Sequence, residues 1–330
     1  MTETIDRLRV DVYLNGNGVL DSLAEDVRQG LTASPKKLSP KYLYDDLGSD
    51  LFERITAQPE YYPTRAERAL LEKLADRLVE ELAPREIVEL GSGSSAKTRV
   101  LLGAQGAKDH LRIYFPFDVS EGIVRTTALD LLRDFPFLHI HGIIGDFEKH
   151  MPLLPDSEGN RLVLFLGGTI GNLDPDARVA FLRNTGALLG PDDHLLIGLD
   201  LVKDKAIIEA AYNDRAGVTA AFNKNILSIM NRTLGADFEP DAFRHHAYFN
   251  ERDSRIEMHL VAEARQDVQI PGIGLLVRIE AGESIWTESS YKFTRESLSD
   301  SLSAAGLRLV ELYTNEDPEQ LFGLALAARG

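Results

Sequence analysis

The chain has 330 residues, of which 44% are hydrophobic and 27% charged, so wholesale disorder is excluded and one or two domains with a large core are expected. Its 36 Lys and Arg residues against 52 Asp and Glu residues give a formal net charge of -16, which argues against a general nucleic-acid partner. The lack of cysteine excludes disulfides and thiolate metal sites, and no segment has the roughly 18 apolar residues that a membrane span requires. We therefore predict a cytoplasmic protein that acts on small molecules and has no membrane partner.

Residues 17–83 have the spacing of helices. A stripe formed by Leu70, Leu71, Leu74 and Leu78 ends shortly before a proline, which is typical of an amphipathic helix and its end. The segment PEYYPT at residues 59–64 contains two prolines and two tyrosines and interrupts this pattern. It predicts a loop that presents aromatic side chains.

Short apolar runs alternate with helical stretches from residue 86 onward. In chain order these runs are EIVEL, LRIYFPFD, LHIHGIIGD, RLVLFLGG and HLLIGLD. Strands that are apolar throughout and alternate with helices indicate a parallel sheet that is covered on both faces. The sequence therefore predicts a Rossmann-like α/β core over about residues 85–202.

Residues 203–292 break this alternation. Helical residues at 207–234 are followed by the runs RIEMHLVAEA and GLLVRIE, which are typical of antiparallel strands. The later runs LRLVELY and LFGLALAA predict a closing strand pair that returns to the first sheet. We predict a larger domain of residues 65–202 and 293–330, whose mostly parallel sheet ends in an antiparallel strand, and a smaller α+β domain of residues 14–64 and 203–292.

A glycine-rich turn directly follows the first core strand. Gly91 and Gly93 allow a ligand to approach the backbone, and the expected helix after them, KTRVLLGAQ, offers free amides. This turn alone does not distinguish NAD from S-adenosylmethionine. Asp118 ends the next strand and suits ribose hydroxyls, while Asp146 and Phe147 after the third suit an adenine amine and its ring.

Two pairs of histidines raise the question of a metal site. His139 and His141 have strand spacing, and His245 is followed by His246. Neither pair has a suitably spaced carboxylate motif. We therefore predict no metal.

Ten segments of the chain closely resemble the L-histidine Nα-methyltransferase family of ergothioneine biosynthesis. They extend over nearly the whole chain, and the PEYYPTR and GTIGN blocks are specific to that family. In chain order the segments are KYLYDDLGSDLFERIT, PEYYPTRAE, VELGSGSSAKTR, FPFDVS, GDFE, FLGGTIGNL, DLVKD, GVTAAFNKN, RIEMHL and TESSYKF.

The resemblance implies an activity and a set of cofactor contacts. The family uses S-adenosylmethionine to convert histidine in three methyl transfers to its trimethylated betaine, hercynine, with the cofactor in the Rossmann-like domain and the substrate in the smaller one. Matched motif by motif, the cofactor contacts fall on Gly91, Lys97, Asp118, Asp146 and Phe147, with Tyr44 nearby.

The resemblance also implies how the substrate is held. Asn172 and Tyr212 would position the α-groups of the amino acid. The imidazole would be addressed by Glu288, Ser290 and Tyr61, and Met258 would pack beside it. No side chain is expected to act as nucleophile or obligatory base, because a neutral amine attacks the sulfonium methyl directly and a desolvating pocket favours the neutral amine.

Three alternatives remain open from the residues alone. An NAD-dependent oxidoreductase would explain the glycine turn and Asp118, but not Asp146 and Phe147. A methyltransferase for tryptophan or tyrosine would have less use for a carboxylate such as Glu288. A non-catalytic binding module on the same fold is the third. The resemblance favours a monomer whose partners are L-histidine and its mono- and dimethylated intermediates.

Overall fold

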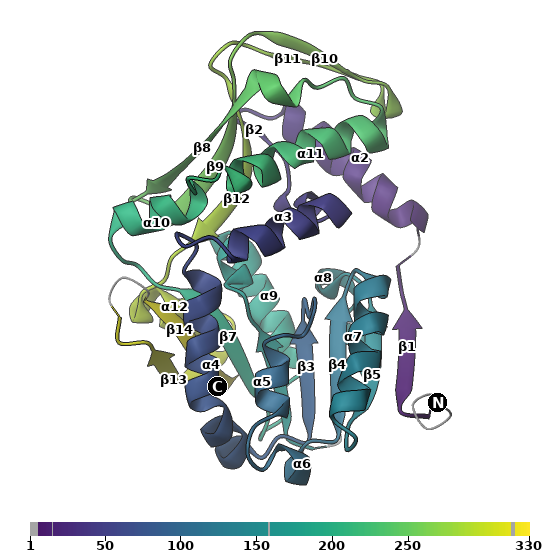
Figure 1. The fold of residues 1–330 in the computed structure, drawn as a ribbon, viewed down its shortest axis with the longest axis vertical. Coiled ribbons are helices and arrows are strands. Elements are labelled where there is room, and N and C mark those ends of the chain that lie inside the picture. The colour runs from purple at the N-terminus through teal and green to yellow at the C-terminus, as the bar shows by residue number, and fades with distance from the viewer. Residues whose placement is uncertain (1–5, 15, 158, 318–320) are drawn as a thin grey trace. The chain divides into compact units, whose positions relative to one another are not determined.

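The computed structural model describes residues 6–14, 16–157, 159–317 and 321–330. The chain folds into two units, each of which is formed by segments that are discontinuous in the sequence (Figure 1). The first unit comprises residues 1–14, 65–201 and 293–330, and the second comprises residues 15–64 and 202–292. Each unit is described by itself.

The first unit is built on an eight-stranded sheet. From edge to edge its strands are β1 (Leu8–Val12), β5 (His139–Ile144), β4 (Ile113–Asp118), β3 (Glu86–Leu90), β6 (Arg161–Phe165), β7 (His194–Asp200), β14 (Phe322–Arg329) and β13 (Leu307–Thr314). Among these strands β14 alone runs antiparallel to its neighbours. The predicted α/β fold, with a mostly parallel sheet and a closing antiparallel strand, is confirmed.

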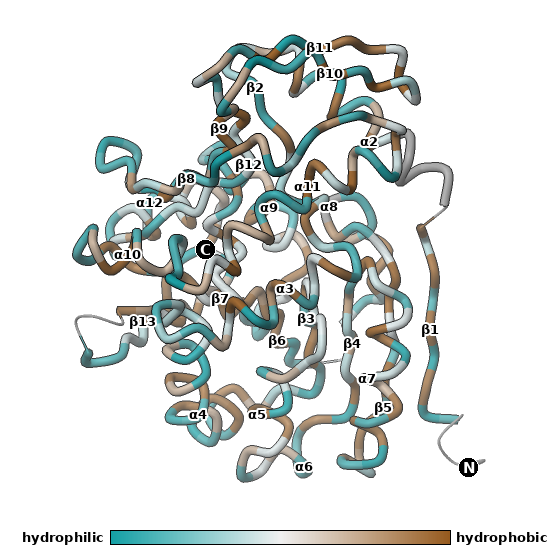
Figure 2. The backbone as a smooth tube through the Cα atoms, turned by 45° about the horizontal axis from the view of Figure 1, so that its top comes forward, coloured by the Kyte–Doolittle hydropathy of each residue, from teal (hydrophilic) through white to brown (hydrophobic). Residues whose placement is uncertain are grey.

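Helices surround this sheet in sequence order. They are α4 (Pro63–Leu82), α5 (Thr98–Leu102), α6 (Ala107–His110), α7 (Glu121–Asp134), α8 (Phe147–His150), η2 (Met151–Leu153), η3 (Thr169–Asn172), α9 (Pro175–Ala187) and α12 (Arg295–Ala304). The apolar stripe of α4 packs with α5 and α7 in one buried cluster that includes Leu164 of β6. Figure 2 shows this amphipathic pattern, since the tube of α4 alternates between hydrophobic and hydrophilic residues.

Successive residues of β6 serve opposite faces of the sheet. Leu164 belongs to the cluster with α4, whereas the Phe165 ring lies 4.4 Å from that of Phe181 on α9. Because side chains alternate along a strand, both faces of β6 are covered, which explains why its sequence is apolar throughout.

The first strand of the sheet has no counterpart in the predicted elements. β1 pairs in parallel with β5, with Leu8 opposite Ile140. Its sequence, LRVDV, alternates apolar with charged residues and is only five residues long. It forms the edge strand beside β5 and leaves the adjoining strands in their predicted places.

The second unit combines helices with an antiparallel sheet. Its helices are α2 (Gly16–Thr32), η1 (Pro40–Leu43), α3 (Asp46–Thr56), α10 (Lys205–Tyr212), α11 (Val218–Leu234), η4 (Pro240–Ala242) and η5 (Pro271–Ile273). Its main sheet has the order β2 (Lys36–Lys37), β12 (Ser284–Tyr291), β9 (Arg255–Ala262) and β8 (Phe243–Asn250), and β10 (Gln266–Ile270) pairs with β11 (Leu275–Ile279) as a separate hairpin.

Asp45 joins two helices of the second unit. As the N-cap of α3 it accepts a hydrogen bond from the Gly48 amide at 2.8 Å, which satisfies one of the free amides of the first turn. Its two oxygens also accept from Asn225 at 2.7 Å and Arg232 at 2.5 Å, both on α11. The start of α3 is thereby fixed against α11.

Two predicted local boundaries differ from the structure. The loop predicted at residues 59–64 ends earlier, because Pro63 begins α4, where a missing amide proton costs nothing. The tyrosines of this loop, Tyr61 and Tyr62, are buried. The helix predicted over KTRVLLGAQ stops at Leu102, and Gly103 is its C-cap.

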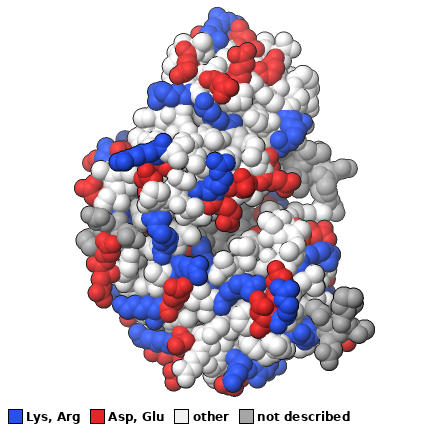
Figure 3. Space-filling view, viewed as in Figure 1, with Lys and Arg blue, Asp and Glu red and all other residues white. Residues whose placement is uncertain are grey.

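Charge is mixed on the visible surface. On the face drawn in Figure 3, basic and acidic side chains are interspersed, so the excess of acidic residues does not form a single acidic surface there. Within the described part of the chain, no helix is long and apolar enough to cross a membrane.

Candidate active site

The glycine turn after β3 has a backbone that requires glycine. Gly91 and Gly93 have φ values of 72° and 47°, in the left-handed region, and no protein atom lies within 4 Å of a Cβ built on either residue. The Gly91 amide donates to the Phe117 carbonyl at 2.8 Å, which ties the turn to β4. A ligand can therefore approach the backbone closely here.

Asp118 lies against this turn, as predicted for residues at the ends of adjacent parallel strands. One carboxylate oxygen accepts from the Gly93 amide at 2.9 Å, and the other accepts from the Ser120 amide at 3.0 Å. Each oxygen retains acceptor capacity for a further donor. The open cradle at the two glycines together with this anchored carboxylate fits the ribose part of S-adenosylmethionine.

A buried polar group supports the turn from below. The Tyr114 hydroxyl donates to Glu89 of β3, so the hydrogen bond of 2.7 Å between Tyr114 and Ser95 is donated by the serine. Ser95 has a φ of 52°, a left-handed conformation that is unfavourable for serine. Burial raises the pKa of Glu89 to about 7, against the hydrogen bond from Tyr114. Tyr114 and Glu89 thus hold Ser95 in the conformation that shapes the turn.

Lys97, a predicted cofactor contact, follows the turn and pairs with a buried carboxylate. Its ammonium lies 2.5 Å from one oxygen of Glu67 on α4, and the other oxygen accepts from the Gly167 amide at 2.7 Å. A Cβ on Gly198 of β7 would lie 1.8 Å from Glu67, so this strand needs a glycine at that point. Glu67 therefore links α4 to two loops at the carboxyl edge of the sheet.

The remaining predicted residues of the first unit lie at this same edge. Asp146 follows β5 by two residues, and Phe147 begins α8, where its ring meets those of Phe165 and Phe181 edge-on at 5.7 Å each. Asn172 is the last residue of η3, after β6. The structure thus brings Asn172 to the same sheet edge as five of the predicted cofactor residues.

The second unit gathers most of the predicted substrate residues on one face of its sheet. Glu288 on β12 pairs with Met258 on β9, and Ser290 pairs with Ile256, so their side chains share a face. All four are buried. Burial raises the pKa of Glu288 to about 7, while the charge of Lys292 acts in the opposite direction.

Two tyrosines complete this group. Tyr212, the last residue of α10, accepts a hydrogen bond from the Lys292 ammonium at 3.2 Å. The same ammonium donates to the Ser290 hydroxyl at 2.9 Å. The Tyr61 ring lies edge-on to that of Tyr212 at 6.2 Å. The second unit thus combines a buried carboxylate, hydroxyls, a thioether and aromatic rings.

Two predicted residues lie in a different unit from the rest of their set. Tyr44 belongs to the second unit, where its ring is edge-on to Phe52 at 5.5 Å and Phe222 at 5.4 Å, and it is 44% exposed. Asn172 belongs to the first unit, away in sequence and fold from the other substrate residues. The cofactor contact of Tyr44 and the substrate contact of Asn172 stay predictions.

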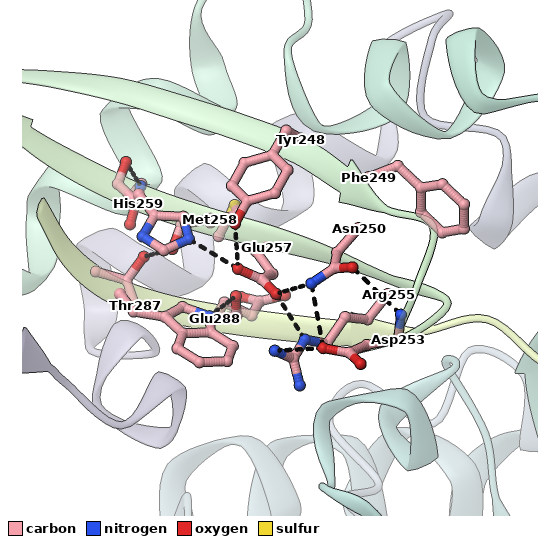
Figure 4. A network of polar contacts seen from close by, with 12 residues as sticks. Tyr248, Phe249, Asn250, Asp253, Arg255, Glu257, Met258, His259, Thr287 and Glu288 are labelled. Carbon is pink, nitrogen blue, oxygen red and sulfur yellow. Dashed lines mark hydrogen bonds and ion pairs between the residues drawn. The ribbon is translucent and has the colours of Figure 1, made fainter. Parts of the chain in front are cut away.

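The opposite face of the β8–β9–β12 sheet holds a polar network that the sequence did not reveal (Figure 4). Its centre is Glu257, which accepts from Tyr248 at 2.6 Å, Asn250 at 2.9 Å, Arg255 at 2.7 Å and His259 at 3.1 Å. Although burial opposes it, these hydrogen bonds hold the pKa of Glu257 at about 2. The network joins β8 to β9 directly behind Met258.

The histidine pairs make ordinary polar contacts. His141 lies 2.8 Å from Asp11, and the ring nitrogens of His245 lie 2.9 Å from the Tyr212 carbonyl and 2.9 Å from the amide of Asn223. Among the described residues, no group of three or more His, Asp or Glu side chains could hold a metal ion.

Lys292, Glu67 and the pair Glu89 and Tyr114 were not predicted as site residues. Lys292 had a usable signal, because Glu288, Ser290 and Lys292 alternate in TESSYK and so fall on one face of a strand. Glu67 and Tyr114 had none, since their partners are distant in the sequence.

Three proteins with related sequences have informative names. The histidine N-alpha-methyltransferase of Mycolicibacterium smegmatis is 46% identical over 317 residues, which cover 96% of this chain and 98% of that protein. The protein of the same name from Mycobacterium tuberculosis is 45% identical over 308 residues, covering 93% and 95%. Ergothioneine biosynthesis protein 1 of Neurospora crassa is 31% identical over 334 residues, covering 99% of this chain and 36% of that protein.

A family match extends over almost the whole chain. The family is described as "Histidine-specific methyltransferase, SAM-dependent", and it matches residues 23–329, which include every predicted site residue. Together with the cofactor cradle in one unit and the buried carboxylate in the other, this match shows that the chain belongs to the histidine-specific, S-adenosylmethionine-dependent methyltransferase family.

Proposed function

We propose that the protein transfers three methyl groups from S-adenosylmethionine to the α-amino nitrogen of L-histidine, forming hercynine in the first step of ergothioneine biosynthesis. The observation that carries the choice of histidine is the buried Glu288, which shares a strand face with Ser290 and Met258. A carboxylate in such a place has to be paired by its ligand, and an imidazole N–H can do this.

The carboxyl edge of the first unit's sheet is proposed to hold the cofactor. The backbone at Gly91 would lie against the methionine part and Asp118 would accept the ribose hydroxyls. Asp146 would accept from the adenine amine, with Phe147 against the ring. Lys97, held by Glu67, and Tyr44 are further proposed contacts.

The substrate is proposed to lie with its imidazole toward the second unit's sheet. Glu288 would accept from a ring N–H, and Ser290 and Tyr61 would bind the same ring. Met258 would pack against its apolar face, as thioethers do with aromatic rings. Asn172 and Tyr212 would hold the α-carboxylate and α-amine.

The reaction places few demands on the protein beyond this positioning. S-adenosylmethionine supplies a methyl group on a sulfonium, and in each transfer the amine lone pair forms a C–N bond as the S–CH₃ bond breaks in line. A proton leaves the nitrogen before each of the three attacks. Desolvation of the amine in the pocket favours its neutral form, so Asn172 and Tyr212 act by orienting it.

We further propose that the enzyme works in the cytoplasm as a monomer, with the mono- and dimethylated intermediates as its other ligands. The balance of charge and the lack of cysteine support an intracellular small-molecule enzyme without a nucleic-acid partner. Light scattering during size-exclusion chromatography tests the monomer, for which we expect a mass near 36.6 kDa.

Mass spectrometry of the product tests the reaction. Purified protein with S-adenosylmethionine and histidine should produce a species heavier than histidine by three methyl groups, with all three on the α-nitrogen in its fragments. Methylation of an imidazole nitrogen would contradict the proposed substrate orientation, because it would place the ring rather than the amine at the sulfonium.

A further inference from the structure

Lys292 is a buried lysine in the second unit whose role the proposed function leaves open. It directly follows β12, is 4% exposed, and lies two residues after Ser290. Its ammonium donates to the Ser290 hydroxyl at 2.9 Å and to the Tyr212 hydroxyl at 3.2 Å. It also lies 5.0 Å from the centre of the Tyr212 ring. A lysine is almost never this buried unless its charge is compensated.

The chemistry of an ammonium group sets the direction of these hydrogen bonds. A lysine ammonium has three N–H donors and no acceptor, so the Ser290 oxygen must accept from it. The serine's own hydrogen then has to point to a different acceptor. With a neutral amine in place of the ammonium, Ser290 would be able to donate to the lysine instead.

The groups around Lys292 leave Glu288 as its opposite charge. Glu288 lies on the same strand face, and the charge of Lys292 lowers the pKa of that carboxyl against the effect of burial. Tyr212 from α10, Tyr61 and Tyr44 also face this carboxyl, and phenols are ordinarily uncharged near pH 7. The ammonium therefore favours a charged, accepting Glu288 beside a donating Ser290.

We propose that Lys292 is a positioning residue that makes Ser290 a hydrogen-bond donor and Glu288 an acceptor, so that together they recognise the neutral imidazole of the substrate. A neutral imidazole has one N–H donor and one acceptor nitrogen, which is the complement of this pair. An indole has only the donor, and an imidazolium has two. The inference rests on the proposed function and adds the protonation state in which the ring is bound.

Kinetics of Lys292→Met test this role, because methionine has a similar length and lacks the charge. We expect the KM for histidine to rise about 10- to 100-fold, as for the loss of one charge-assisted hydrogen bond with its electrostatic effect on Glu288. The KM for S-adenosylmethionine should change less than about twofold, since its proposed contacts are elsewhere. Lys292→Arg, which keeps a charged donor without acceptors, should restore part of the affinity.

Lys36→Met is the matched control. Lys36 lies on β2 beside the other end of β12 and pairs with Glu283 at 2.5 Å, outside the group around Glu288. Its substitution should leave both KM values unchanged. The pH at which kcat/KM for histidine falls on the acid side should rise in Lys292→Met only, because Glu288 then takes up its proton at higher pH.

A measurement on the unaltered enzyme keeps the inference testable if Lys292→Met does not fold. ¹⁵N NMR of ring-labelled histidine bound with S-adenosylhomocysteine should show one protonated and one unprotonated ring nitrogen. A bound imidazolium would overturn the inference, as would a Lys292→Met enzyme with an unchanged KM for histidine and an unchanged pH profile. If the unaltered enzyme does not methylate histidine at all, the proposed function itself is wrong.

Discussion

Glu288 and Met258 lie directly opposite one another across the antiparallel pair of β12 and β9, and both are buried. A carboxylate and a thioether therefore form adjacent parts of one surface. An imidazole matches this surface, because it has an N–H at its edge and an apolar face. The two residues are 30 positions apart in the sequence, and the register of the sheet brings them together.

Replacement of Glu288 by glutamine should impair the use of histidine far more than that of the cofactor. We expect kcat/KM for histidine to fall about 100-fold, because the amide is neutral and offers a donor that conflicts with the ring N–H. The dissociation constant of S-adenosylmethionine, measured by calorimetry, should stay within about twofold. Equal losses for both ligands would show that Glu288 does not read the imidazole.

The pH dependence of kcat/KM for histidine should contain a contribution from Glu288. Its pKa of about 7 means that the accepting carboxylate is present above pH 7 and is lost as the pH falls. Activity should therefore rise with pH through this region. In Glu288→Gln that component should disappear and leave only the titration of the substrate. An identical profile for both proteins would rule out a titrating Glu288.

Tyr114→Phe should weaken cofactor binding specifically. Without the hydroxyl, Ser95 loses the partner that holds its left-handed backbone, and Glu89 loses a hydrogen-bond donor. We expect the affinity for S-adenosylmethionine to fall about 10-fold, the size of one hydrogen bond, with the KM for histidine little changed. Tyr313→Phe, on β13 of the same unit, is the control and should bind the cofactor normally.

Gly198→Ala should disrupt the link made by Glu67. The added Cβ would lie 1.8 Å from a Glu67 oxygen, so the carboxylate must move away from Lys97 and Gly167. We expect a loss of about 1–3 kcal/mol in the free energy of unfolding and weaker cofactor binding. Chemical denaturation measures the first quantity.

Gly122→Ala provides the matched control for that substitution. Gly122 lies in α7, and no atom beyond its own helix lies within 4 Å of the added Cβ. Alanine there should be neutral or stabilising by up to about 1 kcal/mol. The glycine at 198 is required by space, and the prediction fails if both alanine variants are equally stable.

Glu257→Gln should lower stability at neutral pH and have little effect in strong acid. The pKa of Glu257 is about 2 in the folded protein and about 4.5 when unfolded, so its charged form stabilises the fold above pH 4.5, and this contribution is lost as the pH falls toward 2. We expect a loss of about 2 kcal/mol at pH 7, less than the full shift implies because solvent screens part of it. Thermal unfolding of both proteins at pH 7 and pH 3 should show the difference shrinking.

Much of the fold could be predicted because its signals are local. The strands from residue 86 to residue 200 are apolar throughout, since both faces of the sheet are covered, and each of the five predicted runs contains a strand. The closing pair β13 and β14 also follows the prediction. In contrast, β1 is short and half charged, and its identity as a strand depends on β5, which lies over 120 residues further along the chain.

The candidate site divides along the same line. The turn at Gly91 and Gly93 is visible in the sequence because glycine spacing directly encodes backbone freedom. The carboxylates of Glu67 and Glu257 act through partners that only the folded chain brings close. The substrate residues came from the family resemblance, because nothing local marks Tyr61 or Met258 as more than a loop anchor and a core residue.

The central claim is selectivity for the α-amine of histidine, and a competition experiment tests it most directly. The pure protein is incubated with S-adenosylmethionine carrying a deuterated methyl group and an equimolar mixture of the twenty amino acids, and the products are analysed by mass spectrometry. We predict that histidine alone gains label and that it gains three methyl groups. Label on another amino acid, or on none, would contradict the account.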